Sequence, residues 1–440
     1  MWLRARWHNW WITASIRRRI NSPAPNAWIR VVILLRETLL QRPSVSDLKT
    51  LSAEFQSELE RLSTWWKTNA VDRQNGGFYG QINLDGRPVV DAPKGLIYIA
   101  RILWFFSMAA LRSGTQSDAD MALRARDFLV SHFIDTKHGG VFWEVDARGA
   151  PTNTRKQGYA QAFAIYGLAA HAHSSGDEES LEHALALFDT LEARFYDLDH
   201  GGYWEAFARD WVEIEDVRLS EKDDDAPKTM NTHLHILEAY TELYRAKPLP
   251  RVRKALESLI KLHNRKIFRA DIGHLRLFWQ ADWRDVSRDA SFGHDIEASW
   301  LLWEAAEVLG DDNVLAQTRQ VTLQLAETAL AEAMGPDGEM YNERSFSADH
   351  IDTTRIWWVQ AEALVGFLNA YQLSGNPEFF DRAVGMWAFI KQHVLRDGCE
   401  WSWFSSLDAD QISPYQAGHW KACYHNGRAM MECLDRLEKL

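Results

Sequence analysis

The stretch HGGVFWEVDARGAPTNTRKQGYAQAFAIYGLAAHA, residues 138–172, joins two patterns that recur along the chain. It opens on a double-glycine turn inside an alternating aromatic segment, and it closes on a run that is apolar nearly all round. Glycine permits the positive φ angles that tight turns need. A helix that is apolar on every side is typically buried on every side. The stretch therefore predicts a hairpin followed by a buried helix.

This turn recurs at a nearly constant interval. Its second or only glycine falls at residues 77, 140, 202, 273, 338 and 398, so that successive turns are 63, 62, 71, 65 and 60 residues apart. Each interval also holds two helical stretches. A repeat of this kind is typical of an array of helical hairpins, in which neighbouring units bury each other's apolar faces. Six such units can close into a ring.

The two helical stretches of a unit differ in their apolar pattern. Some carry one apolar stripe and one charged face, which indicates an outer layer, as in residues 181–195 and 314–334. Others are apolar nearly all round and are expected to be buried on both sides, as in residues 96–111, 159–172, 296–308 and 357–371. The sequence therefore predicts an all-α fold, an (α/α)6 barrel of twelve helices in two layers. Short β-hairpins are expected at the mouth, where the inner helices begin.

The composition excludes several classes of protein. The 440 residues are 46% hydrophobic and 25% charged, which fits a globular chain rather than a disordered or fibrous one. The net charge of −12 argues against nucleic acid, whose phosphates require concentrated positive charge. Three cysteines, Cys399, Cys423 and Cys433, are too few to form a disulfide framework, so a reducing cytoplasm is expected. The 21 tryptophans favour a carbohydrate ligand, because flat aromatic faces stack on sugar rings.

The N-terminal segment differs sharply from the rest. Residues 1–45 contain eight arginines and one glutamate, whereas the remainder is strongly acidic. No apolar run in this segment is long enough for a transmembrane helix, and arginine or histidine interrupts each candidate signal sequence. We therefore predict a basic extension outside the fold at residues 1–45, one barrel domain at residues 46–440, and no membrane partner.

Polar side chains occupy the predicted starts of the inner helices, so they should converge on the barrel axis at its mouth. Asn231, His235 and Glu238 follow one another at i, i+4 and i+7 and share one helix face. His233 lies two residues from His235 and points elsewhere, so no metal-binding histidine pair is expected there. The other axial candidates are Lys94, Arg101, Tyr159, Gln161, His294, Asp295, Glu297, Trp357, Trp358, Gln360, Glu362, Trp420, Lys421, Tyr424, His425 and Arg428, the last two spaced i and i+3.

Three histidines among these candidates indicate a particular chemistry. Histidines, an arginine and carboxylates in an aromatic cup suit proton transfer at a carbon beside a carbonyl. Two histidines can act as base and acid on opposite faces of that carbon, while a third opens a sugar ring. Arg101 can stabilise the enediolate. His294 and Glu297 are spaced i and i+3, so the carboxylate is expected to orient that imidazole. Neither a metal nor a cofactor is expected.

Several motifs resemble those of the cellobiose 2-epimerases in the N-acylglucosamine 2-epimerase superfamily. They are KTMNTHLHILEAYT (228–241), GHDIEASW (293–300), WWVQAEA (357–363), KGL (94–96), ARILW (100–104) and YHNGR (424–428). The resemblance runs from about residue 47 to the C-terminus. It implies the same barrel and an activity that inverts C2 of the reducing-end glucose or mannose of β-1,4-linked disaccharides without a redox cofactor.

The resemblance also implies roles for individual residues. It makes His294 and His425 the acid/base pair, His235 the ring-opening residue and Arg101 the stabiliser of the enediolate. It also implies that Glu297 orients a histidine and that Trp358 and Trp420 stack against the sugar rings. The other expected substrate contacts are Tyr159, Asn231, Glu238, Trp357 and Glu362. A small disaccharide is the expected partner of a chain that is a monomer or a weak homodimer.

Three alternatives stay open at this stage. A glycoside hydrolase could use paired carboxylates among Asp295, Glu297 and Glu362, although it has no need for three axial histidines. An aldose–ketose isomerase would share the enediol and differ in where the proton returns. A non-catalytic sugar-binding protein would keep the tryptophans but would not need His294 and His425.

Overall fold

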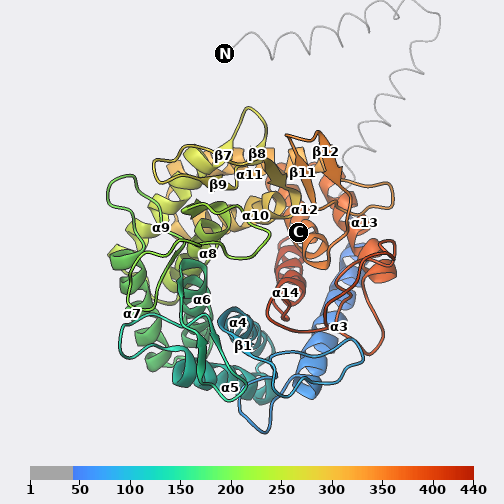
Figure 1. Ribbon diagram of the computed structural model, residues 1–440. Coiled ribbons are helices and arrows are strands. Elements are labelled where there is room, and N and C mark those ends of the chain that lie inside the picture. The colour runs from blue at the N-terminus through green and yellow to red at the C-terminus, as the bar shows by residue number, and fades with distance from the viewer. Residues whose placement is uncertain (1–42) are drawn as a thin grey trace, which may run out of the picture. The chain divides into compact units, whose positions relative to one another are not determined.

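Alternating helices of the chain form two concentric layers in the computed structural model, which describes residues 43–440 (Figure 1). The outer layer of the described part consists of α3 (Val45–Asn69), α5 (Gln116–Phe133), α7 (Glu178–Arg194), α9 (Pro250–Leu262), α11 (Asp312–Glu332) and α13 (Pro377–His393). The inner layer consists of α4 (Leu96–Ser113), α6 (Gly158–Ser175), α8 (Met230–Ala246), α10 (Phe292–Leu309), α12 (Trp357–Ser374) and α14 (His425–Glu438). The predicted (α/α)6 barrel is confirmed.

Residues 1–42 of the predicted basic extension lie outside the described residues, so the extension stays a prediction. Residues 46–440 form one compact unit. Within it, a π-helical segment, η1 (His263–Ile267), continues α9 and was not expected from the sequence.

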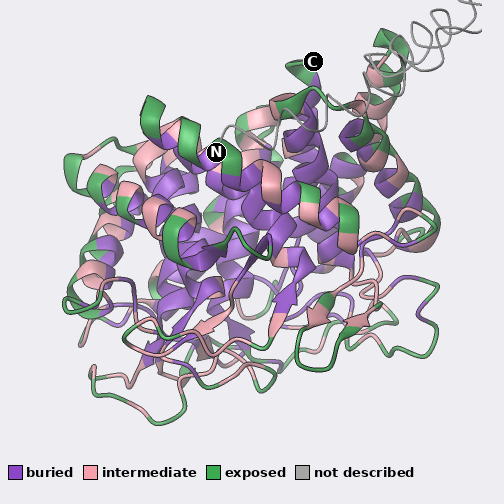
Figure 2. Cartoon of the chain, turned by 90° about the horizontal axis from the view of Figure 1, so that it is seen from above, coloured by how far each residue is buried: buried purple, intermediate pink, exposed green. Residues whose placement is uncertain are grey.

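Burial explains why the inner helices are apolar all round. In α6 every residue from Gly158 to Ala172 is buried, whereas α7 buries only one stripe of its surface. Figure 2 shows the same contrast between the buried centre and the partly exposed outer helices. Helix α4 is long and apolar enough to cross a membrane, but it packs against α5 and α6 as an inner helix of the barrel.

Each outer helix of the described chain is followed by the predicted glycine turn. The six glycines that define the repeat all have positive φ angles, from +60° at Gly77 to +89° at Gly338, a region that favours glycine. In five of the six units a residue just after the outer helix pairs with one just after the glycine. These pairs are Val71–Phe78, Ile134–Val141, Tyr196–Tyr203, Met334–Met340 and the strands β7 (Phe268–Arg269) and β8 (His274–Leu275).

Short antiparallel pairings then link each unit to the next around the ring. The residues that precede an inner helix pair with the hairpin of the following unit, as β1 (Lys94–Gly95) does with β2 (Glu144–Val145). The same pairing joins β4 (Lys156–Gln157) to β5 (Ala206–Phe207), β6 (Lys228–Thr229) to β9 (Phe278–Trp279) and β10 (Asp289–Ser291) to β11 (Glu343–Ser345). Two outer strands, β3 (Pro151–Asn153) and β12 (His350–Asp352), extend these sheets. Bridges between Ile356 and Phe404 and between Ile82 and Ala417 complete the circle.

Buried ion pairs repeat with the same geometry. Lys94, two residues before α4, donates to Asp72 at 2.9 Å, and its side chain is 0% exposed. Lys156 pairs with Asp135, and Lys228 with Asp197, at corresponding positions of the next two units. Lys94 is therefore a structural residue of the hairpin, and its predicted place on the axis is wrong. The strand pairings and bridges, joined by ion pairs in the first three units, fix the starts of the inner helices at the mouth, where Figure 2 shows strands and loops gathered at one end.

Candidate active site

One cavity lies at the starts of the inner helices. It is lined by Arg101, Tyr159, Asn231, His235, His294, Glu297, Trp357, Trp358, Trp403, Trp420 and His425. All but two of these stand in the first two turns of α4, α6, α8, α10, α12 or α14, and the two others lie between α13 and α14. The structure thus brings together, from all six units, the residues to which the sequence analysis gave a catalytic or substrate-binding role, with the exceptions of Glu238 and Glu362.

Each of the three cavity histidines is held through its Nδ1 atom. His235 Nδ1 lies 2.8 Å from Oε2 of Glu238, one turn along α8. His425 Nδ1 lies 2.6 Å from Oε1 of Glu362 on α12. His294 Nδ1 lies 2.8 Å from Oγ of Ser291, which also caps the N-terminus of α10. Because Nδ1 is occupied in each ring, Nε2 is the atom left for a ligand.

Arg101 is fixed by polar and aromatic contacts. Nη2 donates to the Tyr159 hydroxyl at 3.1 Å, and Nη1 donates to the carbonyl of Trp420 at 3.3 Å. Its guanidinium also lies 4.6 Å from the Phe163 ring centroid and 4.8 Å from that of Tyr424. These contacts hold a cation against the cavity with little freedom to move.

Trp358 packs against two of the histidines at once. Its ring centroid is 4.9 Å from that of His294 and 5.5 Å from that of His425. Gly293 makes this approach possible, because a Cβ atom there would lie 2.4 Å from the indole. The tryptophan therefore sets the spacing between the two imidazoles predicted to act on opposite faces of a carbon.

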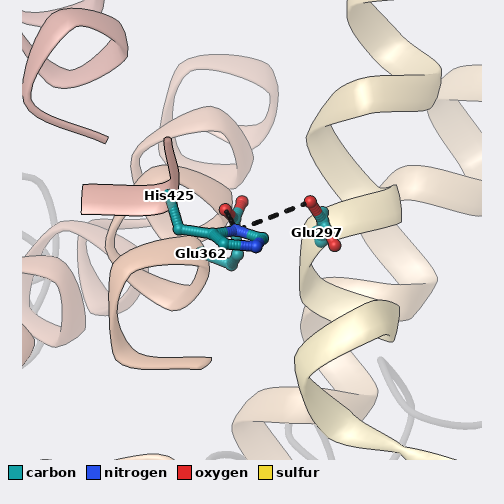
Figure 3. Close-up of side chains that lie close together, drawn as sticks. All are labelled: Glu297, Glu362 and His425. Atoms are coloured by element: carbon teal, nitrogen blue, oxygen red, sulfur yellow. Dashed lines mark hydrogen bonds and ion pairs between the residues drawn. The ribbon is translucent and has the colours of Figure 1, made fainter. Parts of the chain in front are cut away.

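Three carboxylates meet one arginine at the base of the cavity, and Glu297 is the one of them that also lines it. Arg428 of α14 donates through Nη1 to Glu238 and through Nη2 to Glu297 (2.6 Å) and Glu362 (2.7 Å). Figure 3 shows Glu297 and Glu362 pointing from α10 and α12 toward His425. The three carboxylates come from three inner helices and are all buried.

Comparison with known proteins identifies the family. The family model for N-acylglucosamine 2-epimerase (GlcNAc 2-epimerase) matches residues 77–429. The chain belongs to the N-acylglucosamine 2-epimerase family. It is 44% identical to the cellobiose 2-epimerase of Bacteroides fragilis over 388 residues, covering 87% of this chain and 98% of that one. It is 39% identical to the cellobiose 2-epimerase of Ruminococcus albus over 391 residues, with the same coverage of both chains.

A solved structure agrees. The structure of the cellobiose 2-epimerase from Spirochaeta thermophila is 40% identical to this chain, with a TM-score of 0.81, and the match covers 90% of this chain and 99% of that one. The resemblance inferred from the sequence motifs is confirmed.

Burial and charge set the protonation of the carboxylates in this member of the family. Burial raises the pKa of Glu297 to about 7, and the neighbouring charge of Glu362 adds to this effect against the opposing charge of Arg428. Burial also raises the pKa of Glu362, although Arg428 and Trp300 oppose it. Burial acts in the same direction on Glu238, but Arg428, His235 and Tyr424 outweigh it and lower its pKa to about 2. Glu238 is therefore ionised at neutral pH, whereas Glu297 gains and loses its proton at a pH close to neutral.

The same burial keeps two of the histidines neutral. Burial, with the charge of His235, lowers the pKa of His294 to about 3. Burial lowers the pKa of His425 well below its usual value, and the charges of Arg101 and Arg428 act in the same direction. At neutral pH both imidazoles are free bases, as a residue that accepts a proton from carbon must be.

Three of these side chains are close enough together to suggest a cation site. The ligand atoms of Glu297, Glu362 and His425 all lie within 4.8 Å of one another (Figure 3). However, Nη2 of Arg428 already lies between the two carboxylates and bonds to both. The set therefore fits the guanidinium better than a metal ion, which would have to displace it.

Two sequence-based expectations need correction. Glu238 and Glu362 were expected to contact substrate, but they lie below the lining residues, where they bind the Nδ1 atoms of His235 and His425. Glu297 was expected to orient His294, yet it bonds to Arg428 instead. The i, i+3 spacing only places two side chains on one face, and a partner from another helix can take either of them.

One residue that lines the cavity was not predicted, and one axial candidate was given no role. Trp403 lines the cavity from the segment before α14, which has no helical periodicity from which to infer its direction. Arg428 was an axial candidate spaced i+3 from His425, but neither its partners nor a role was predicted. Its three carboxylate partners come from α8, α10 and α12, so no local spacing in the sequence points to them.

Proposed function

We propose that this chain is an epimerase that inverts C2 of the reducing-end glucose or mannose in β-1,4-linked disaccharides such as cellobiose, lactose or mannobiose. The observation that carries the proposal is the convergence of His235, His294 and His425 from three inner helices on one cavity beside Arg101. Relatives named cellobiose 2-epimerase, 39–44% identical over most of the chain, support the same reaction.

The first step is the opening of the sugar ring. The closed ring has no carbonyl at C1, so a proton must leave the C1 hydroxyl and another must reach the ring oxygen. His235 is suited to this shuttle, because Glu238 holds its Nδ1 atom and leaves Nε2 free. The product is an aldehyde whose C2 proton is acidified.

The second step exchanges the proton at C2. One of His294 and His425 removes it, and the electron pair of the C–H bond forms the C1–C2 double bond of an enediolate with its negative charge on O1. Arg101 is the fixed cation in the cavity that can stabilise this charge. The other histidine, which must enter this step carrying a proton from solvent, delivers it to the opposite face of C2 as the aldehyde carbonyl re-forms at C1. The first histidine then releases the proton it removed to solvent, and ring closure gives the epimer.

The arrangement favours this reaction over the hydrolase and binding-protein alternatives. Glu362 is engaged by His425, Arg428 and Trp300 beneath the lining, which leaves it unsuited to act on a glycosidic oxygen. A binding protein has no need for neutral histidines such as His294 and His425, whose Nδ1 atoms are held in place by Ser291 and Glu362. An aldose–ketose isomerisation shares the enediolate, so a small amount of the ketose is compatible with the proposal.

The test is incubation of the purified protein with cellobiose, lactose and mannobiose in heavy water, followed by NMR. Deuterium at C2 in an epimerised product supports the proposal. Free glucose from cellobiose would favour a hydrolase, and deuterium at C1 of a dominant ketose would favour an isomerase.

We also propose that the protein works in the cytoplasm as a monomer or a weak homodimer. All three cysteines are free, and two of them, Cys423 and Cys433, are buried, which suits a reducing compartment. Fractionation of the native host and light scattering of the purified chain test these two points.

A further inference from the structure

Arg428 occupies an unusual position in the barrel. It stands on the first turn of α14, and its side chain is 1% exposed. Through its two terminal nitrogens it reaches carboxylates of α8, α10 and α12, which are Glu238, Glu297 and Glu362. One guanidinium thus joins four of the six inner helices directly below the cavity.

Two of those carboxylates are also the partners of cavity histidines. Glu238 uses Oε1 for Arg428 and Oε2 for His235. Glu362 uses a single oxygen, Oε1, for both Arg428 and His425. Any shift of the guanidinium would therefore displace the oxygens to which both imidazoles are bonded.

Aromatic rings fix the plane of this guanidinium. Its central carbon lies 4.7 Å from the centroid of Trp300 and 4.1 Å from that of Tyr424, whose hydroxyl also bonds to Glu238. A planar fork held in this way can direct separate N–H groups at separate carboxylates, which the single ammonium of a lysine cannot do.

We propose that Arg428 is the shared positioning residue of the reaction: by holding Glu238 and Glu362, it sets His235 and His425 against the substrate. The proposal rests on the epimerase function given above. Arg428 does not line the cavity, so it acts through the two carboxylates rather than on the sugar.

The charge of Arg428 matters as well as its shape. The titratable groups around it are Glu238 and His235 of α8, Glu297 of α10, Glu362 of α12, and Tyr424 and His425 at the start of α14. Without the cation, three buried carboxylates would lose the charge that opposes their protonation. A protonated carboxyl no longer stabilises an imidazole that gains a proton during turnover.

The test compares Arg428→Lys and Arg428→Met with the wild-type enzyme by NMR assay of cellobiose epimerisation from about pH 5 to about pH 9. Because lysine keeps the charge but loses the fork, Arg428→Lys should lower kcat about 30-fold or more with KM within about threefold and the acidic limb of the profile in place. Arg428→Met should lower kcat further and shift the midpoint of the acidic limb to a higher pH by about one unit.

A matched control is available on the same helix. Arg436 also lies over the Trp300 ring, at 5.8 Å, but its carboxylate partner is Glu432. Arg436→Lys should lower the melting temperature while leaving kcat and its pH profile as in the wild type.

Three outcomes would overturn the inference. The first is a kcat of Arg428→Lys above a third of the wild-type value, and the second is a loss equal to that of the Arg436 control. The third is a loss in Arg428→Met that is the same at every pH. If Arg428→Met does not fold, the kcat of Arg428→Lys still decides whether the inference stands. An inactive wild-type enzyme would instead refute the proposed function.

Discussion

Replacing Glu362 with Gln separates a positioning role from a substrate contact. In the structure Oε1 of Glu362 lies 2.6 Å from His425 Nδ1 and 2.7 Å from Arg428, and Oε2 accepts from the Trp300 indole at 3.0 Å. All three partners are donors. Glutamine keeps the shape of the side chain but replaces one acceptor oxygen with an amide donor, so one of these bonds becomes a clash between donors.

The expected loss follows from the charge that forms on His425. When this imidazole takes the C2 proton, its bond to Glu362 becomes a bond between a cation and an anion. Hydrogen bonds to charged groups contribute about 1.5–3 kcal/mol, and an unpaired buried donor adds a penalty of similar size. A net loss of about 2–4 kcal/mol in the transition state corresponds to a fall of about 30- to 900-fold in kcat. KM should change less than about threefold, because Glu362 does not line the cavity.

The assay is NMR measurement of kcat and KM with cellobiose, together with the melting temperature. Glu242→Gln is the matched control: Glu242 is buried, accepts from Arg245, and lies 3.0 Å from His173 Nδ1, but none of these residues lines the cavity. It should lower stability without lowering kcat. A Glu362→Gln enzyme with kcat within threefold of wild type, or with its whole loss in KM, would refute the reasoning.

The other predictions concern the histidines, metal ions and pH. His294→Asn and His425→Asn should each abolish epimerisation, because each change removes a proton-transfer group rather than a stacking surface. The affinity for cellobiose, measured by calorimetry, should stay within about tenfold of the wild-type value. More than a tenth of wild-type kcat in both variants would contradict this. Activity should survive exhaustive EDTA treatment, because the guanidinium of Arg428 occupies the position between the carboxylates; a loss that zinc or manganese reverses would contradict it. Because burial raises the pKa of Glu297 to about 7, this carboxylate, which Arg428 binds, loses its charge as the pH falls through about 7, and kcat/KM should fall over the same range. Glu297→Gln should remove that limb, and an unchanged limb would assign it to another group.

The barrel could be predicted because its sequence signals are local and repeated. The glycines at the six turns adopt positive φ, a conformation that few other residues tolerate, so they mark the period. Inner helices such as α6 have to be apolar on every side because neighbours cover every side. The bridges between successive units left no comparable signal, since two-residue strands such as β1 are too short to show alternation.

Most of the cavity lining could be predicted because these residues stand near the starts of the inner helices, but the bonds between the site residues could not. His235 and Glu238 are spaced i and i+3 on α8, yet Glu238 was expected to contact substrate rather than to hold His235 Nδ1. The same spacing failed for His294, because the nearby cap Ser291 takes its Nδ1 atom. His425 and Glu362 are 63 residues apart on different helices, so no local spacing rule connects them.

The placement of charge around the cavity matches the charges that the proposed reaction creates. Negative charge develops on the substrate oxygen at C1, and Arg101, held by Tyr159 and the Trp420 carbonyl, is a fixed cation on the cavity wall. Positive charge develops on an imidazole such as His425, whose Nδ1 atom binds Glu362, a residue that does not line the cavity. The Arg101 guanidinium and the Glu362 carboxyl are both in place before substrate arrives, so little reorganisation is needed when the charges form. The fold provides this arrangement because each inner helix begins at the same mouth and contributes its first turns to a common centre.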